Sequence, residues 1–71
     1  MRITVNGEPV VVDVDPAAGP CDLDQLLVLR ALPLEQVAVE HNGKVVRRAQ
    51  RKDTHLHDGD VVEIVTLVGG G

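Results

Sequence analysis

The chain contains no phenylalanine, tyrosine or tryptophan in its 71 residues, so its core must be built from aliphatic side chains. It also lacks an excess of positive charge, because 7 lysines and arginines stand against 11 acidic residues and leave a net charge of −4. Nucleic-acid binding proteins need cations that neutralise phosphates, and many add aromatic rings on which bases stack. The composition therefore argues against a nucleic-acid partner.

Cysteine and long apolar runs are scarce as well. The single cysteine, Cys21, cannot form an internal disulfide, which fits a reducing compartment. No apolar run approaches the roughly 20 residues of a membrane-spanning helix. The first residues turn polar too soon for a signal peptide. We therefore expect a cytoplasmic protein that does not associate with membranes.

Hydrophobic residues make up 44% of the chain, which indicates a globular domain rather than a disordered segment. A chain of this length forms one small domain and buries only about 60% of the surface that its unfolded state exposes. Such a small domain has little spare stability for a deep catalytic cleft, and no pairing of a nucleophile with a base is evident. The sequence therefore predicts a protein that is not an enzyme and holds no cofactor.

Two Asn-Gly pairs, Asn6-Gly7 and Asn42-Gly43, are strong hairpin signals between short β-branched runs. After the first pair, Glu8-Pro9 suggests a longer loop, and Pro9 suits a strand start or an edge. The run at 61–68 is apolar on both faces, which is typical of a strand inside a sheet. The predicted strands cover residues 1–5, 10–14, 37–41, 45–46 and 61–68.

One amphipathic helix of roughly nine or ten residues is predicted between the second and third strands. Asp22 is a good N-cap, and Gln25 three residues later completes a capping box. Pro33 ends the helix by about Leu32. Its apolar face holds Leu23, Leu26, Leu27 and Ala31. The fold class is therefore α+β, with one helix packed on one face of a small sheet.

The last strand offers a candidate partner-binding surface. If Val62 and Ile64 point toward the helix, strand alternation directs the residues between them to the opposite face. An apolar patch exposed there is typical of an interface, although β propensity alone also accounts for such residues. The outward-facing residues are Val61, Glu63, Val65 and Leu67.

Three glycines, Gly69, Gly70 and Gly71, close the sequence directly after this strand. Glycine runs at chain ends often simply fray. A glycine tail can also deliver its terminal carboxylate into a narrow enzyme site that excludes water, as activation of the carboxylate to an acyl-adenylate requires. Extended, the three residues span about 10 Å. Gly71 is the candidate reacting residue, and Gly69 and Gly70 supply reach.

The stretch from Asp58 to Gly71 resembles the closing signature of the ThiS family, the sulfur carriers of thiamine biosynthesis. Ile3–Gly7 and Val37–Val46 resemble the opening strand and the third-strand hairpin of that family. The resemblance implies a β-grasp, ubiquitin-like fold, with the last strand beside the first. It also implies a β-grasp domain at residues 1–68 and a flexible tail at residues 69–71.

The same resemblance implies a reaction cycle in which a ThiF-like adenylyltransferase adenylates Gly71 with ATP and Mg²⁺. A cysteine-persulfide donor then replaces the adenylate and leaves a thiocarboxylate. Thiazole synthase, ThiG, receives the sulfur for the thiazole ring of thiamine. Three alternatives stay open: a sulfur carrier for the molybdopterin or cysteine pathway, a non-covalent β-grasp interaction domain, and a modifier attached to lysines.

Other residues have two interpretations each. Cys21 is either a small semi-buried side chain or a thiol activated by the helix start. His55 and His57 share a side if extended, but two ligands are too few for zinc and His41 is distant in sequence, so we expect exposed histidines and no metal site. The basic cluster Arg47, Arg48, Arg51 and Lys52 is either a solvated loop or a docking patch for an acidic partner.

The sequence also departs from the ThiS pattern in two places. Many relatives carry Pro-Arg-Ser-Gln-Trp where this chain has Arg47-Arg48-Ala49-Gln50-Arg51. An aromatic residue commonly precedes the closing Val-Gly-Gly-Gly, where this chain has Leu67. These differences bear on the contacts with partners rather than on the chemistry of the tail.

Overall fold

The computed structural model describes residues 1–13 and 15–67. Val14, Val68 and the glycines at 69–71, all part of the predictions above, lie outside the described residues. The described strands are β1 (Arg2–Val5), β2 (Glu8–Val11), β3 (Val37–His41), β4 (Lys44–Val46) and β5 (Val61–Thr66). The helical elements are α1 (Leu23–Leu29) and the 3₁₀ segments η1 (Pro16–Ala18), η2 (Leu34–Gln36) and η3 (Arg48–Asp53).

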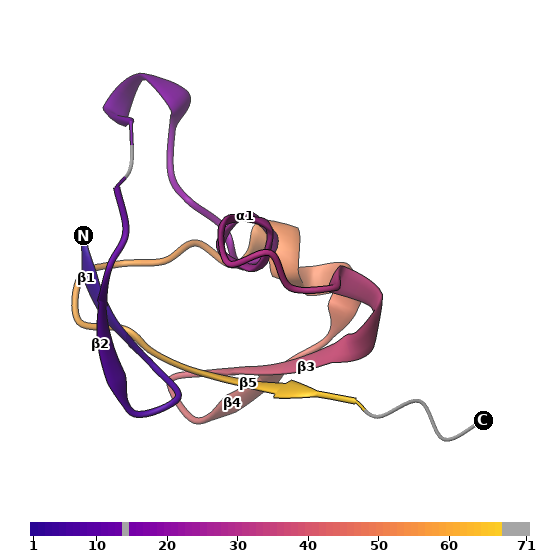
Figure 1. The fold of residues 1–71 in the computed structure, drawn as a ribbon. Helices are drawn as coiled ribbons and strands as arrows, with labels where there is room; N and C mark the ends of the chain where they lie inside the picture. The colour runs from indigo at the N-terminus through magenta and orange to yellow at the C-terminus, as the bar shows by residue number, and fades with distance from the viewer. Residues whose placement is uncertain (14, 68–71) are drawn as a thin grey trace.

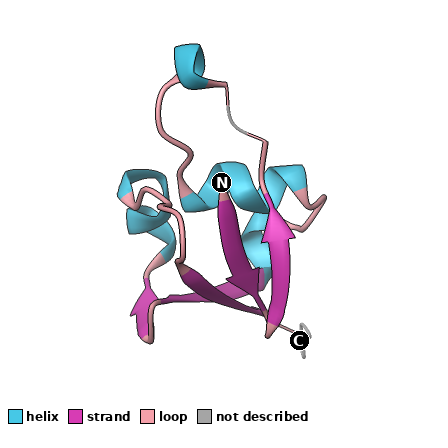
Figure 2. Cartoon of the chain, turned by 90° about the vertical axis from the view of Figure 1, so that its left-hand side faces the viewer, coloured by secondary structure: helices cyan, strands magenta, loops and turns pink. Residues whose placement is uncertain are grey.

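The five strands form one mixed sheet in the order β2-β1-β5-β3-β4. β5 runs parallel to β1 and antiparallel to β3, so the last strand occupies the centre of the sheet. Figure 1 shows α1 above the sheet, and Figure 2 shows the helical segments on one side of the strands. The predicted α+β class and the central position of the last strand beside the first are both confirmed.

The core is aliphatic, as the absence of aromatic residues requires. Leu23, Leu26 and Leu27 from α1 are at most 1% exposed and pack against buried residues of the sheet. Burying each leucine stabilises the fold by about 1.5–3 kcal/mol relative to leaving it exposed. The sheet contributes Ile3, Val5, Val37, Val39, Val62 and Ile64 to this core.

The first hairpin is tighter than predicted. Val5 pairs directly with Glu8, so the loop is the two-residue turn Asn6-Gly7, with φ values of 50° and 81°. Two positive φ values are typical of a type I′ turn, which suits the twist of the strands. β2 therefore begins at Glu8 and ends at Val11, and the predicted strand at 10–14 was placed too late. Pro9 lies on an edge strand, where its missing N–H is tolerated.

The helix begins as predicted and ends earlier. Asp22 Oδ1 accepts a hydrogen bond from the Gln25 N–H (2.9 Å), and Gln25 Oε1 accepts one from the Asp22 N–H (3.0 Å), which completes the capping box. At the other end the chain forms a Schellman motif: Leu32 N–H donates to the Leu27 carbonyl and Ala31 N–H to that of Val28. Ala31 has a φ of 55° and is exposed, so the prediction that it lies on the buried helix face is wrong.

Residues 48–53 form the 3₁₀ segment η3. The structure corrects the prediction for one member of the basic cluster, Arg51. Arg51 is 2% exposed, and its Nη2 and Nη1 atoms donate to the carbonyls of Leu34 (2.6 Å) and Val37 (3.3 Å). Its Nε lies 2.9 Å from Asp24 Oδ1, a close ion pair without hydrogen-bond alignment.

Arg51 is thus a buried residue and not part of a solvated loop or a docking patch. The rest of the cluster, Arg47, Arg48 and Lys52, is exposed.

Candidate functional site

The outward side of β5 forms as the alternation predicts. Val62 and Ile64 are 0% and 8% exposed and face the core, whereas Val61 and Val65 are 42% and 59% exposed. Glu63 is exposed, and Leu67, just past the strand, is 52% exposed. The opposite face of the sheet from α1 therefore presents a partly apolar strip along its central strand. The role of this strip in partner binding stays a prediction.

The end of β5 is fixed to the body of the domain. Leu67, the last described residue, donates its N–H to the Gln36 carbonyl at 2.6 Å. This bond continues the contact between β5 and the β3 side of the sheet past the last paired residue, Thr66. The predicted tail, Gly69, Gly70 and Gly71, lies outside the described residues, and Leu67 is the last residue whose attachment to the sheet is described.

Each Asn-Gly turn also clamps β5 through its asparagine side chain. Asn6 Oδ1 accepts from the Ile64 N–H (2.6 Å), and Asn6 Nδ2 donates to the Ile64 carbonyl (3.1 Å). Asn42 Oδ1 accepts from the Val61 N–H (2.8 Å). The two clamps reach β5 from β1 and β3, where strand pairing with those neighbours ends. The sequence predicted only the turns, because nothing in the local pattern shows that both asparagines face the same distant strand.

Asp60 organises the start of β5 and is the residue that the sequence analysis missed most clearly. Its Oδ2 accepts a hydrogen bond from the His57 N–H (2.9 Å) and lies 2.7 Å from His41 Nε2, while Asn42 Nδ2 donates to Oδ1 (3.2 Å). Burial alone would raise the pKa of Asp60, but the hydrogen bonds from His41, His57 and Asn42 outweigh it and leave the pKa lowered. His41 is therefore half-buried, and its side chain is a structural partner of Asp60.

The remaining histidines and the cysteine do not form a reactive site. His55 and His57 are exposed on either side of the buried Leu56, as predicted for an extended segment. The described residues contain no group of three or more His, Cys, Asp or Glu side chains that could hold a metal. Cys21 is 7% exposed, and burial, followed by the charge of Asp22, raises its pKa. The interpretation of Cys21 as an activated thiol is therefore wrong.

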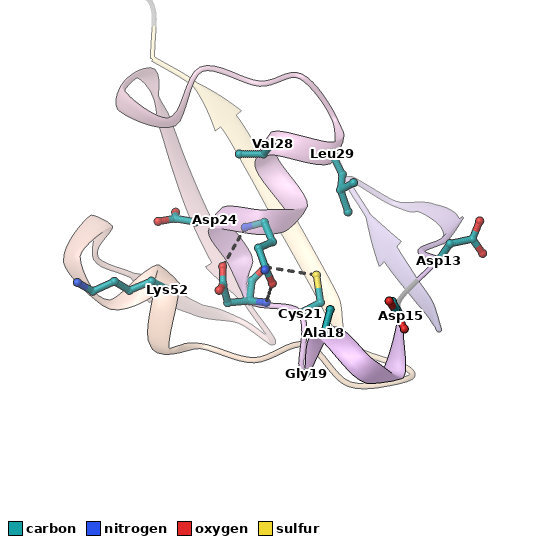
Figure 3. Close-up of a pocket in the computed structure, with 11 residues that line it drawn as sticks. Asp13, Asp15, Ala18, Gly19, Cys21, Asp24, Val28, Leu29 and Lys52 are labelled. Atoms are coloured by element: carbon teal, nitrogen blue, oxygen red, sulfur yellow. Dashed lines mark hydrogen bonds between the residues drawn. The ribbon is translucent and has the colours of Figure 1, made fainter.

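A groove of about 400 Å³ lies between α1 and the loop that precedes it, and Figure 3 shows the residues around it. Val28 and Leu29 of α1 are 62% and 64% exposed along one side. Asp13 and Asp15 stand on the loop, and Lys52 approaches from η3. The buried thiol of Cys21 forms part of its lining. The groove is separate from the β5 strip, because its lining includes none of Val61, Glu63, Val65 and Leu67.

No helix among residues 1–13 and 15–67 is long and apolar enough to cross a membrane. The candidate site among the described residues therefore centres on β5: an outward strip predicted to dock partners, three groups of hydrogen bonds that hold the strand, and the Leu67–Gln36 hydrogen bond at its end.

Comparison with solved structures identifies the fold. The crystal structure of the thiamine biosynthesis protein ThiS from Geobacter metallireducens superposes with a TM-score of 0.79 and is 39% identical, with both chains covered completely. The solution structure of a thiamine biosynthesis protein from the same organism gives the same TM-score at 38% identity, covering all of this chain and 88% of the other. The β-grasp fold is thereby confirmed.

Curated relatives point the same way. The chain is 35% identical to the uncharacterized protein ycf40 of Porphyra purpurea, over its whole length and 93% of that protein. It is also 37% identical to part of a thiazole synthase from Magnetococcus marinus, matching all of this chain but only 20% of that enzyme. The ThiS family model matches residues 3–71. Together with the fold, this match shows that the chain belongs to the ThiS family, the small sulfur carriers of thiamine biosynthesis.

Proposed function

We propose that this chain carries sulfur as a thiocarboxylate on Gly71 and delivers it for the thiazole ring of thiamine. The observation that supports the proposal best is the anchoring of β5, which lies in the centre of the sheet and is followed by Leu67, bonded to Gln36; in the sequence only Val68 separates Leu67 from the glycines. The family match includes those glycines. A rigid body would present a tail that is slim enough to enter an enzyme site closed to water.

The chemistry proceeds in three steps: activation of the carboxylate, transfer of sulfur to the acyl carbon, and reduction of the acyl disulfide. A ThiF-like adenylyltransferase binds ATP and Mg²⁺, and a Gly71 carboxylate oxygen attacks the α-phosphorus and displaces pyrophosphate. The terminal sulfur of a cysteine persulfide then attacks the acyl carbon and displaces AMP. A second thiol reduces the resulting acyl disulfide, which releases the thiocarboxylate and leaves a disulfide on the donor side. Every catalytic group belongs to a partner, so the carrier is a co-substrate rather than an enzyme.

Thiazole synthase is the proposed acceptor. The Magnetococcus marinus relative is named a thiazole synthase and includes a segment 37% identical to this entire chain. A carrier-like segment within the polypeptide of the acceptor enzyme supports a direct transfer between the two. We assign docking on both partners to Val61, Glu63, Val65 and Leu67, because these residues line the strand that leads to the tail.

In this proposal residues 1–68 form the recognition body, residues 69–71 form the tail, and charging takes place in the cytoplasm. The test is ATP–pyrophosphate exchange catalysed by a purified ThiF-like adenylyltransferase. The full chain should support exchange, and a variant lacking Gly71 should not, although its far-UV circular dichroism spectrum and its thermal midpoint should match those of the full chain.

Three outcomes would count against the proposal. Unchanged exchange in the variant that lacks Gly71 would show that the reacting group is not the Gly71 carboxylate. Binding without any exchange would favour a non-covalent interaction domain. A charged carrier that supplies sulfur to a molybdopterin or cysteine pathway enzyme, but not to thiazole synthase, would assign the chain to another pathway.

A further inference from the structure

Two glutamates face each other across the central strands of the open sheet face. Glu40 of β3 is the direct cross-strand partner of Glu63 of β5, and both are exposed. Neither carboxylate forms an ion pair with any other described residue. Like charges directly opposite each other in an antiparallel pair destabilise a sheet. The fold therefore keeps an unfavourable pair in the middle of its predicted docking surface.

Apolar side chains surround this pair on the same face. Val45 of β4 is opposite Glu40 on its other side and is 74% exposed. Two residues along each strand, Ala38 pairs with Val65, which is 59% exposed. Val61, two residues before Glu63 on the same side of β5, is 42% exposed. We call this set of six residues (Ala38, Glu40, Val45, Val61, Glu63 and Val65) the glutamate patch.

No lysine or arginine among the described residues forms an ion pair with Glu40 or Glu63, and none belongs to the glutamate patch. Lys44 neighbours Val45 on β4, but strand alternation directs it to the other face of the sheet. Arg2 is on the open face of β1, where it pairs across to Val11 on the edge strand β2 rather than toward β3. The patch thus combines a concentrated negative charge with an exposed apolar surround.

We infer that the glutamate patch receives one cationic side chain, an arginine or a lysine, from the docking surface of the activating enzyme. Two carboxylates about one strand spacing apart can share a guanidinium or ammonium group, and charge-assisted hydrogen bonds of this kind are strong. The valines around them suit the aliphatic stem of the same side chain. A single basic residue with apolar neighbours is therefore the partner chemistry that fits this surface.

The inference rests on the proposed function, because the partner is identified through the tail. The outward side of β5 leads through Val65 to Leu67, where the described chain ends at its hydrogen bond to Gln36. In the proposed function, the enzyme that takes up the following glycines docks on this face. The activating enzyme is the first to do so in the proposed cycle, since it acts on the tail before sulfur is attached.

This arrangement predicts opposite effects on folding and on docking. Neutralising the pair as Glu40→Gln with Glu63→Gln removes the repulsion in the free carrier, so the thermal midpoint should stay the same or rise. The same change removes the counter-charges that the enzyme meets, so docking should weaken. A loss of docking caused by partial unfolding would carry a lowered midpoint instead, which separates the two explanations.

The experiment measures the KM of the carrier in ATP–pyrophosphate exchange with the ThiF-like adenylyltransferase. For the double variant we expect KM to rise at least about tenfold, while the rate at saturating carrier is unchanged. The dependence of KM on salt should also become shallower. The matched control is Asp13→Asn with Asp53→Asn, which removes the same charge from two exposed positions outside the patch and should change KM by less than about twofold.

An unchanged KM in the glutamate double variant would overturn the inference, and so would an equal rise in the aspartate control. Weaker transfer to thiazole synthase with normal activation would also contradict it, because the cation would then belong to the acceptor. Failure of the wild-type chain to support any exchange would instead refute the proposed function. Direct binding to the enzyme without ATP would then decide the inference by itself, since the patch predicts weaker binding of the double variant there too.

Discussion

Replacing Asn6 with glycine should loosen the central strand without disturbing the turn. Glycine adopts the φ of 50° found at Asn6 without strain, so the turn geometry is kept. The substitution removes both hydrogen bonds to the backbone of Ile64, at 2.6 and 3.1 Å. Asn6→Gly is therefore a selective test of the clamp on β5.

The expected loss of stability follows from the two bonds. Each contributes about 1 kcal/mol net, so Asn6→Gly should lower the free energy of unfolding by about 2 kcal/mol. A domain of this length has a total of roughly 4–11 kcal/mol. The midpoint of thermal unfolding should fall by roughly 8–16 °C. Asn6→Asp keeps the acceptor for the Ile64 N–H and should be intermediate, whereas Asn6→Ala adds the strain of a left-handed alanine and should be worst.

The assay must suit a chain without aromatic residues, which has no useful intrinsic fluorescence. Far-UV circular dichroism or calorimetry gives the midpoint, and hydrogen exchange at the Ile64 amide reports the clamp locally. A loss below about 0.5 kcal/mol for Asn6→Gly, with the Ile64 amide still protected, would refute the reasoning. It would show that hydrogen bonds to water replace the two Asn6 side-chain hydrogen bonds with no net loss in the free energy of unfolding.

Three further predictions follow from the described contacts. Arg51→Ala should destabilise the fold by about 3 kcal/mol in denaturant unfolding, because two carbonyls and Asp24 lose a buried partner, whereas Asp24→Asn should lose only about 1 kcal/mol because Asp24 is 31% exposed. Ala31→Gly should raise stability by about 0.5–1 kcal/mol by relieving a positive φ, and no gain would contradict the Schellman assignment. The pKa of Asp60 is lowered in the folded state, so its contribution to the free energy of unfolding is complete above about pH 4 and is lost as the pH falls through that folded pKa. Asp60→Asn should be less stable at neutral pH and should flatten this part of a stability–pH curve.

Local signals in the sequence were enough to predict much of the fold. Alternation and the Asn-Gly pairs located β3 and the centre of the sheet, and Asp22 with Gln25 marked the helix start. The helix end was misplaced because a Schellman motif usually signals itself by glycine, and this chain uses Ala31. The second strand was misplaced because Glu8-Pro9 reads as loop although an edge strand accepts proline.

The hydrogen bonds that hold the candidate site could not be predicted in the same way. Asn6 and Asn42 contact β5 across 58 and 19 residues of sequence, and His41 reaches Asp60, just before β5, across 19; no local period reports such contacts. Arg51 was misjudged for a related reason. An arginine within a basic run is typical of a solvated surface, and only its pairing with Asp24 of α1 and two carbonyls makes its burial possible.

The central claim, that Gly71 carries sulfur, is tested most directly by the intact mass after incubation with ATP, the ThiF-like adenylyltransferase and a persulfide donor. We expect a gain of about 16 Da, which a C-terminal fragment must separate from oxidation of Met1. Iodoacetamide should then add one label at the C-terminus under native conditions, while the buried Cys21 stays unlabelled. A chain that gains no alkylatable sulfur at Gly71, under conditions that charge an established ThiS carrier, would contradict the account.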